Sequence, residues 1–237
     1  MRVLVVGSCG KKKLHTSPKQ PKCQDIIGIH GIKHWKRKLQ SLCVPARDMY
    51  TGPQNNELVK AVDLLRTISN VEVQLVIISA GFGLLEEDDL VPPYDCSFTT
   101  MKMSEIRKQS EELELQPSFT RLIANRFDII YLALGKRYLT ALGNDIPSLL
   151  KTPTVSFHEL KSDYVIRIPC AAETVKAFSK RGYKIHGVVG FKGDLLRILV
   201  QYSLEQHNPG NEVRKWSNSK YLRKLVFRLG GLGKNRV

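Results

Sequence analysis

The sequence contains no apolar run that approaches the roughly 20 residues a membrane-spanning helix needs. Residues 2–6 are mostly apolar, but this run is only about half as long as the core of a signal peptide, and three lysines follow it closely. We interpret residues 2–6 as a first strand and expect neither a membrane span nor export.

Cysteine is scarce and shows no metal-binding spacing. The five cysteines are odd in number and widely separated, and none forms a C-x-x-C pair. This pattern favours a reducing compartment, the cytoplasm, and argues against a zinc ribbon. The four acids at 86–89 are adjacent rather than spaced to converge on an ion, so we interpret them as a solvated turn. We expect no metal and no cofactor.

Acidic residues are rare at both ends of the chain. The protein has 37 Lys and Arg against 22 Asp and Glu, a formal net charge of +15. Residues 11–38 hold nine basic residues and one acid, and residues 213–237 hold eight basic residues and no acid. Such clusters indicate binding to phosphates, with DNA favoured over RNA. A solvated basic surface without a partner is the alternative.

Runs of strand length alternate with helical patterns along the first two thirds of the chain. Residues 2–6, 75–79 and 127–134 are buried-strand candidates, and 56–68 has the apolar spacing of an amphipathic helix. A strand, crossover and strand order is typical of a parallel sheet. We therefore predict a three-layer α/β fold with a mainly parallel central sheet, of the uracil-DNA-glycosylase-like or Rossmann-like type.

A change of composition near Pro169 suggests a division of the chain. We predict an α/β catalytic core over residues 1–168 and a helical, basic extension over 169–237 that binds nucleic acid or docks on the core. Within the extension, residues 194–205 have a helical pattern with Asp194 as the expected N-cap. Residues 184–193, interrupted by glycines, are expected to precede that helix.

The stretch 75–95 is the predicted centre of the functional site. Its strand ends in Ala80-Gly81-Phe82-Gly83, and the rigid segment 91–95 then presents Tyr94 and Asp95. In an open α/β sheet, ligands bind beyond the carboxyl ends of the strands. A glycine turn, an aromatic ring and an acid after one strand end therefore indicate a site there.

Two other loops follow predicted strands in the same way. Residues 7–13 form a small-residue turn with three lysines, which suits an anion or is an ordinary polar turn. Residues 135–138 repeat the arrangement after the third strand. In the sequence between these two loops, residues 44–54 form a loop that carries Asp48. The alternative to a functional role for Asp48 is a structural one, as a helix cap or as the partner of Arg47.

Four sequence blocks resemble one bacterial and phage family. They are Ser8-Cys9 with the following lysines, residues 45–52 (PARDMYTG), residues 79–85 (SAGFGLL) and residues 93–95 (PYD). Together they resemble DUF6884, over about the first 140 residues. The departure is Gly81, where the family often has lysine. The family is similar to proteins linked with modified nucleobases, including glycosylase-like enzymes, so the resemblance implies base or nucleotide chemistry.

On this basis we expect a DNA base glycosylase that hydrolyses the N-glycosidic bond of a flipped, modified base, in keeping with defence against phage with modified DNA. A carboxylate stabilises the sugar cation of such a reaction or activates water, and Asp48 and Asp95 are the candidates. The expected base-binding residues are Tyr50, Phe82, Tyr94, Ser79 and Gly83. The expected phosphate-binding residues are Ser8, Cys9, Lys11, Lys12, Lys13, Arg47, Lys136, Arg137, Arg223 and Lys224.

Other functions remain open. A base transferase, or an amidating enzyme that uses Lys11 or Lys13 against a nitrile-bearing base, requires a buried lysine with a lowered pKa. A non-catalytic nucleic-acid-binding protein explains the charge without any chemistry. Cys9 as a nucleophile lacks a convincing partner, because His15 lies in a stretch expected to be mobile.

Overall fold

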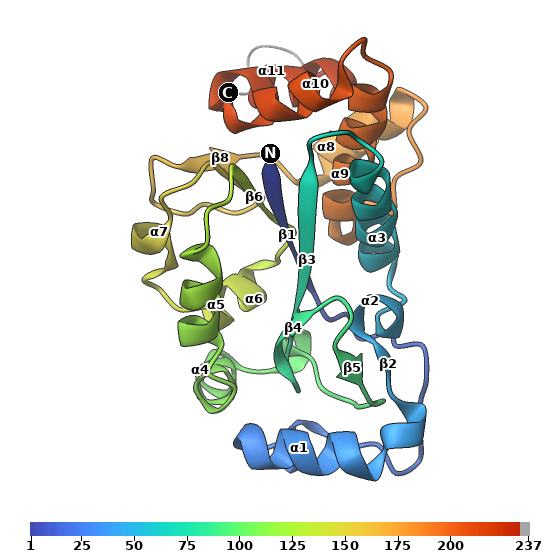
Figure 1. The fold of residues 1–237 in the computed structure, drawn as a ribbon, viewed down its shortest axis with the longest axis vertical. Coiled ribbons are helices and arrows are strands. Elements are labelled where there is room, and N and C mark those ends of the chain that lie inside the picture. Colours follow the sequence, from blue (N-terminus) through green and yellow to red (C-terminus); the bar gives the residue numbers. More distant parts are fainter. Residues whose placement is uncertain (233–237) are drawn as a thin grey trace.

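A computed structural model describes residues 1–232, and its centre is a six-stranded sheet (Figure 1). The strand order is β4-β3-β1-β6-β7-β8, and every neighbouring pair is parallel except β3 with β4. The predicted α/β fold with a mainly parallel sheet is therefore confirmed. The strands are β1 (Arg2–Ser8), β3 (Glu72–Ser79), β4 (Gly83–Glu86), β6 (Ile129–Leu132), β7 (Thr154–Ser156) and β8 (Val165–Arg167), with β2 (Val44–Pro45) and β5 (Leu90–Val91) in a separate antiparallel pair.

Helices cover both faces of the sheet. Along β1 the side chains alternate: Leu4 and Val6 pack into one hydrophobic cluster, and Val3 and Val5 pack into the other. The first cluster is completed by α4 (Met103–Glu112), α5 (Leu115–Ile123), α6 (Lys136–Ala141) and α7 (Ile146–Leu149). The second is completed by α3 (Pro53–Arg66), α8 (Ala172–Lys180), α9 (Gly187–Leu204), α10 (Pro209–Arg214) and α11 (Ser219–Gly230).

The two basic segments lie at opposite ends of the sheet. Helix α1 (Gly28–Lys38) lies beyond the carboxyl ends of the parallel strands, together with α2 (Ala46–Met49) (Figure 1). Helices α10 and α11 lie beyond the other end (Figure 1). The basic residues of the C-terminal segment are thus far from the sheet edge where we expected the site. Among residues 1–232, no helix combines the length and apolar character that crossing a membrane requires.

The predicted start of the long C-terminal helix is wrong. Helix α9 begins at Gly187, and Asp194 lies inside it rather than at its N-cap. The Asp194 carboxylate is fully buried and accepts hydrogen bonds from the backbone N–H of His186 (2.8 Å) and from its ring Nδ1 (2.7 Å). The glycines in residues 184–193 do not break the helix, because tertiary packing outweighs their low helix propensity.

That packing depends on close contact between α9 and α3. A Cβ atom at Gly193 would lie 2.3 Å from the carbonyl oxygen of Gln54 in α3. Through this contact, α9 shares one core with Val3 and Val5 of the central strand. Helices α8 and α9, which follow the predicted boundary at Pro169, therefore complete the second face of the sheet.

We expect Gly193→Ala to lower the free energy of unfolding by about 1–3 kcal/mol, because the added methyl group forces α9 away from α3. Gly52→Ala is the matched control, since a Cβ there meets no atom within 4 Å. Urea unfolding of both variants checks this. Equal stabilities would show that the two helices separate at little cost.

Candidate functional site

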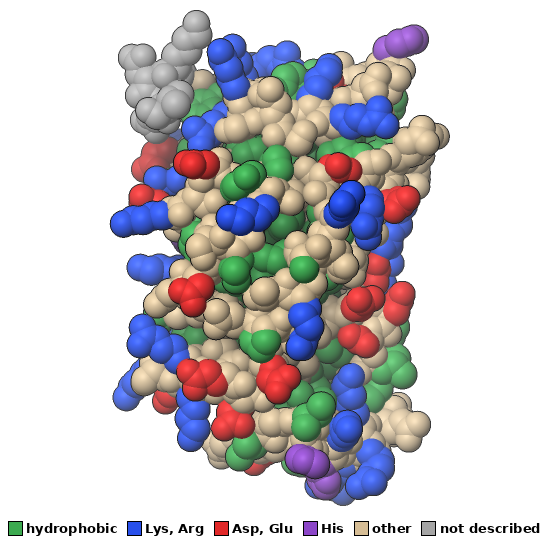
Figure 2. Space-filling view, turned by 60° about the vertical axis from the view of Figure 1, so that its left-hand side comes forward, with side chains coloured by type: hydrophobic (Ala, Val, Ile, Leu, Met, Phe, Trp, Pro, Cys, Tyr) green, Lys and Arg blue, Asp and Glu red, His purple; other side chains and the backbone are tan. Residues whose placement is uncertain are grey.

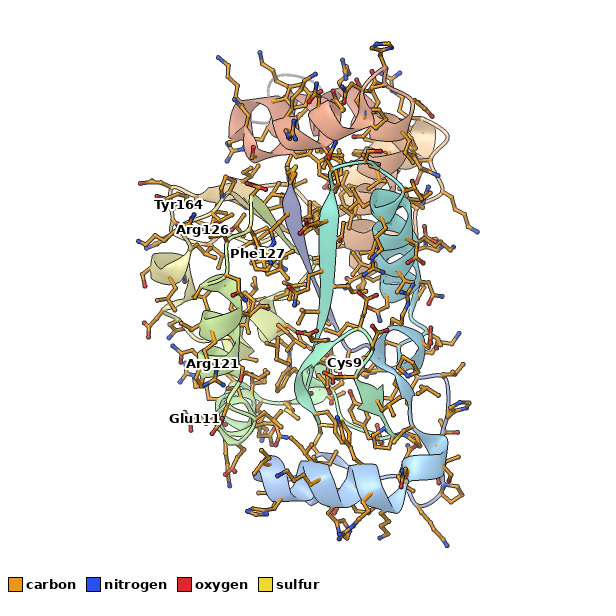
Figure 3. The ribbon with its side chains drawn as sticks, viewed as in Figure 1. Cys9, Glu111, Arg121, Arg126, Phe127 and Tyr164 are labelled. Carbon is orange, nitrogen blue, oxygen red and sulfur yellow. A yellow bond between two sulfur atoms is a disulfide. The ribbon has the colours of Figure 1, made fainter. Side chains whose placement is uncertain are left out.

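The site lies where the strand order of the sheet changes direction. From β1 the chain continues to β3 on one side and later returns to β6 on the other, so the carboxyl end of β1 is a topological switch point. Ligands of open α/β sheets bind at such points. Cys9 follows β1 at this position (Figure 3), with Ser79 at the end of β3 and Tyr138 on α6 after β6.

Two tyrosines and a serine form a buried hydrogen-bonded chain at this edge. The Tyr94 hydroxyl lies 2.7 Å from Ser79 Oγ and 2.9 Å from the Tyr50 hydroxyl. Ser79 Oγ also accepts the backbone N–H groups of Gly81 and Phe82. Because these fill its lone pairs, Ser79 donates its proton to Tyr94, and Tyr94 donates to Tyr50. Burial raises the pKa of both phenols, so they stay neutral.

Cys9 is held beside the hydrogen-bonded chain of Ser79, Tyr94 and Tyr50. Its side chain is only 1% exposed, and its Sγ accepts the backbone N–H of Ala80 at 3.3 Å. The Tyr138 hydroxyl donates to the Cys9 carbonyl and lies 3.2 Å from Sγ. Ser97 Oγ completes this polar group, 3.3 Å from the same hydroxyl. Ser97 was not among the residues predicted from the sequence. The only indication of its role in the sequence is its position two residues after Asp95.

Lys13 brings an amine into the site. Its Nζ lies 4.2 Å from the centroid of the Tyr94 ring and 3.3 Å from the carbonyl oxygen of Gly10. Burial lowers the pKa of Lys13, although the charges of Cys9 and Asp95 act in the opposite direction. Lys11 and Lys12 are exposed. Among the three lysines of the loop, Lys13 is therefore the one with the environment of a reactive amine.

The two candidate carboxylates differ in position. Asp95 is exposed but close enough to Lys13 for its charge to act on the pKa of that amine. Its backbone N–H donates to the carbonyl of Pro21 at 2.8 Å. Asp48 is exposed on α2, where its charge acts on Arg47. Asp95, not Asp48, adjoins the buried polar cluster.

The other predicted base-binding residues also lie near Tyr94. The Phe82 ring packs edge-on against Tyr94 with centroids 4.9 Å apart. Gly83 opens β4 with a φ of 79°, which favours glycine. At Gly81, a Cβ would lie 2.9 Å from the Tyr94 ring and 3.0 Å from Ile26. The lysine that the resemblance implies for this position is absent, and the amine beside Tyr94 comes from Lys13 instead.

Several predicted phosphate-binding residues already have protein partners. The Arg47 guanidinium pairs with Asp63 (2.7 Å) and Glu87 (2.9 Å). Glu87 is only 9% exposed and also pairs with Arg66, so the acidic turn at 86–89 is partly an ion-pair network. The remaining predicted phosphate-binding residues are dispersed. Arg137 donates to the carbonyls of Phe98 and Met101, and Ser8 Oγ accepts from Gln54 at 3.5 Å. Lys136 is exposed after β6, whereas Arg223 and Lys224 lie on α11 at the other end of the sheet.

Residues 15–38, which follow Lys13, cover the site. Helix α1 has no buried residue, but Ile26, just before it, is fully buried and packs near Gly81. Trp35 Nε1 donates to the carbonyl of Asp25 at 2.8 Å. Figure 2 shows Lys, Arg and His side chains gathered at this end of the molecule. A positively charged cover thus closes over the polar cluster.

A disulfide between Cys23 and Cys96 fastens this cover to the loop that carries Tyr94 and Asp95. The cysteine pattern favoured a reducing compartment, where disulfides are rare, and this pair departs from that expectation. Widely spaced cysteines give no pairing signal, because the fold alone brings residues 73 positions apart together. Cys9, Cys43 and Cys170 are free thiols.

Reduction of this disulfide is expected to lower the free energy of unfolding by roughly 2–4 kcal/mol, because the unfolded chain regains the entropy of a long closed loop. Urea unfolding with and without a reductant measures the difference. Cys43→Ser, which removes a free thiol, should keep the full effect of the reductant, whereas Cys96→Ser should abolish it. An unchanged midpoint on reduction of the unaltered protein would contradict the link.

Comparison with known families gives one match. The profile of the family described as "Family of unknown function (DUF6884)" matches residues 34–164, more than half of the chain. The match includes the blocks at 45–52, 79–85 and 93–95, whereas Ser8, Cys9 and Lys13 precede it. No curated protein matches the sequence.

Proposed function

The chain belongs to the family of unknown function DUF6884, and from the geometry of its site we propose that it is a DNA base glycosylase in which Lys13 and Asp95 carry out the chemistry. The observation that carries this proposal is the Lys13 amine, whose pKa burial lowers and which lies at the switch point of the sheet beside Asp95. A lysine with a lowered pKa has a larger fraction of neutral, nucleophilic amine.

The proposed reaction begins with attack of Lys13 Nζ on C1′ of the target nucleotide. The bond between C1′ and the base nitrogen breaks, its electron pair leaves with the base, and the base takes up a proton. The sugar, now bound to Nζ, opens to an imine, and water hydrolyses the imine to return the free amine. The Asp95 carboxylate stabilises the positive charge that develops on the sugar. The net reaction is hydrolysis, with no cofactor required.

Access to the site requires movement of the cover. Tyr50, Phe82 and Tyr94 are each less than 5% exposed, so a flipped base reaches these rings only when residues 15–38 move aside and Lys13, paired with Tyr50, stays in place. The same segment carries Lys33, Lys36, Arg37 and Lys38 on α1. We propose that these charges hold the DNA backbone at the carboxyl edge of the sheet, and that the enzyme acts in the cytoplasm.

Trapping with borohydride tests the role of Lys13. Duplex DNA with normal, hydroxymethylated or glucosylated bases is incubated with the protein and reductant, and adducts and free bases are identified by mass spectrometry. We expect an adduct at Lys13 and release of one base type. Lys13→Met should lose both, while Lys176→Met, at an exposed lysine on α8, should retain them. Base release by Lys13→Met at the rate of the unaltered protein would refute the mechanism.

The two carboxylates provide a matched pair of variants. Asp95→Asn should reduce the rate of base release by roughly 100-fold or more, because the sugar cation loses its neighbouring charge. Asp48→Asn, on α2, should stay within about threefold of the unaltered protein, since Asp48 lies outside the cluster. A larger loss of base release in Asp48→Asn than in Asp95→Asn would place the reaction at α2.

The pH dependence of base release should follow the Lys13 amine. The neutral amine is the reactive form, so kcat/KM should rise with pH through the pKa of Lys13. Because burial lowers that pKa, the midpoint of the rise should fall below 10.5, the ordinary value for lysine. A rate that is flat across this range would exclude a lysine nucleophile.

The same amine supports a second candidate, a nucleobase transferase or an enzyme that amidates a nitrile-bearing base. In that reaction Lys13 attacks the base rather than the sugar, and no free base appears. Protein that binds DNA, releases no base and forms a Lys13 adduct with a nitrile-bearing base would favour this candidate. Binding without any adduct would leave only the non-catalytic function.

A further inference from the structure

A second group of basic side chains follows β6, β7 and β8, away from Lys13. Lys136 comes after β6, His158 two residues after β7, and Arg167 ends β8. The parallel register pairs Ser156 with Arg167, so the loops after these two strands leave the sheet side by side. Positively charged or titratable groups thus converge at one part of the carboxyl edge.

Lys192, in α9, adds a buried cation to this group. It is only 6% exposed, and its Nζ donates to the carbonyl of Val189 in its own helix at 3.3 Å. Within residues 1–232 it forms no ion pair, and the nearby Asp194 carboxylate is bonded to His186. A buried cation without a counter-charge is unfavourable. An anion at this point would offset that cost.

His158 lies among these charges. Burial lowers its pKa, and the charges of Lys192, Lys136 and Arg167 lower it further. The acids of this region give little compensation: Glu159 is exposed and 4.0 Å from Arg167, and Asp145 accepts from Gln116 at 3.4 Å. The local field around the His158 ring is therefore positive.

A cleft of about 700 Å³ opens beside His158. Its polar lining includes Lys136, His158 and Lys161, together with the carboxylates of Asp145 and Glu159. Helix α9 begins at Gly187, next to Cys170, whose Sγ donates to the carbonyl of Val188 at 3.2 Å. The amino end of this 18-residue helix adds a partial positive charge on the Lys192 side.

We propose that His158, Lys136 and Lys192 form a binding site for a phosphate group at the carboxyl ends of β6 and β7. A phosphate there pairs with Lys136 and accepts a hydrogen bond from the His158 ring, and the buried Lys192 adds positive charge from α9. The group is either free, as in a mononucleotide, or part of a nucleic-acid backbone. The proposal does not depend on the chemistry at Lys13.

Binding should be linked to protonation of His158. The anion favours the charged imidazole, so saturation should raise the pKa of His158 by about one unit, which corresponds to roughly tenfold tighter binding to the protonated form. Affinity should therefore fall as pH rises through the pKa of His158. The pKa is followed by NMR of the histidine rings, with His158→Gln to assign the signal.

Three probes distinguish the source of the phosphate: inorganic phosphate, a 5′-mononucleotide, and a single-stranded oligonucleotide with free hydroxyl ends. A response to the first two supports a site for free phosphates, and a response to the oligonucleotide alone supports a backbone site. No change in the His158 signal with any probe would overturn the proposal.

Variants test the cations separately. Lys136→Met and Lys192→Met should each weaken phosphate binding at least about tenfold. Lys176→Met, an exposed lysine on α8, should leave it unchanged. Since Lys136 is exposed, its variant remains informative if Lys192→Met fails to fold. Equal affinity in Lys136→Met and Lys176→Met would also overturn the proposal. Lys13→Met should bind phosphate normally, so the two proposed sites succeed or fail independently.

Discussion

The pairing of β1 with β3 and β6 is the constraint on which the rest of the structure depends. Val3 to Val6 are fully or almost fully buried, with alternate side chains in the two clusters that hold the helical layers. Because β1 has a parallel neighbour on each side, the residues after three strands meet at one point. Cys9, Ser79 and Tyr138 are neighbours for this reason alone.

The polar cluster at this point is closed from outside by a segment that contributes little to the core. Its attachment rests on Ile26, on the bond from Asp95 to Pro21, and on the disulfide between Cys23 and Cys96. Such an arrangement suits a site that must exclude water yet open for a large substrate. It also places the positive charge of α1 beyond the carboxyl ends of the parallel strands.

Two lysines differ from the other basic residues in their surroundings. Lys13 and Lys192 are both largely buried, and burial lowers the pKa of each. Lys13 has Asp95 and an aromatic ring nearby, whereas Lys192 has no carboxylate partner among the described residues. We propose a reactive amine at Lys13, where burial outweighs the opposing charge of Asp95, and a bound anion at Lys192. Net charge alone does not distinguish these roles.

Local sequence patterns determined much of the architecture. The β-branched runs at 2–6 and 75–79 and the apolar spacing at 56–68 specify β1, β3 and α3, because burial of such faces dominates folding. The glycine turn after β3 and the family blocks likewise fall at the carboxyl edge of the sheet, where the buried polar cluster lies. The start of α9 was not predictable in this way, since Gly193 serves a contact with α3 that periodicity does not reveal.

Only the tertiary structure decided how the site is composed. Asp48 and Asp95 are equivalent as residues in loops, and folding brings Asp95 beside Lys13 and leaves Asp48 on α2. Tyr138 and the partner of Cys23 are equally invisible to local patterns, because each contact joins segments far apart in the chain. Burial and proximity set the pKa of Lys13, and both are properties of the fold rather than of the sequence around it.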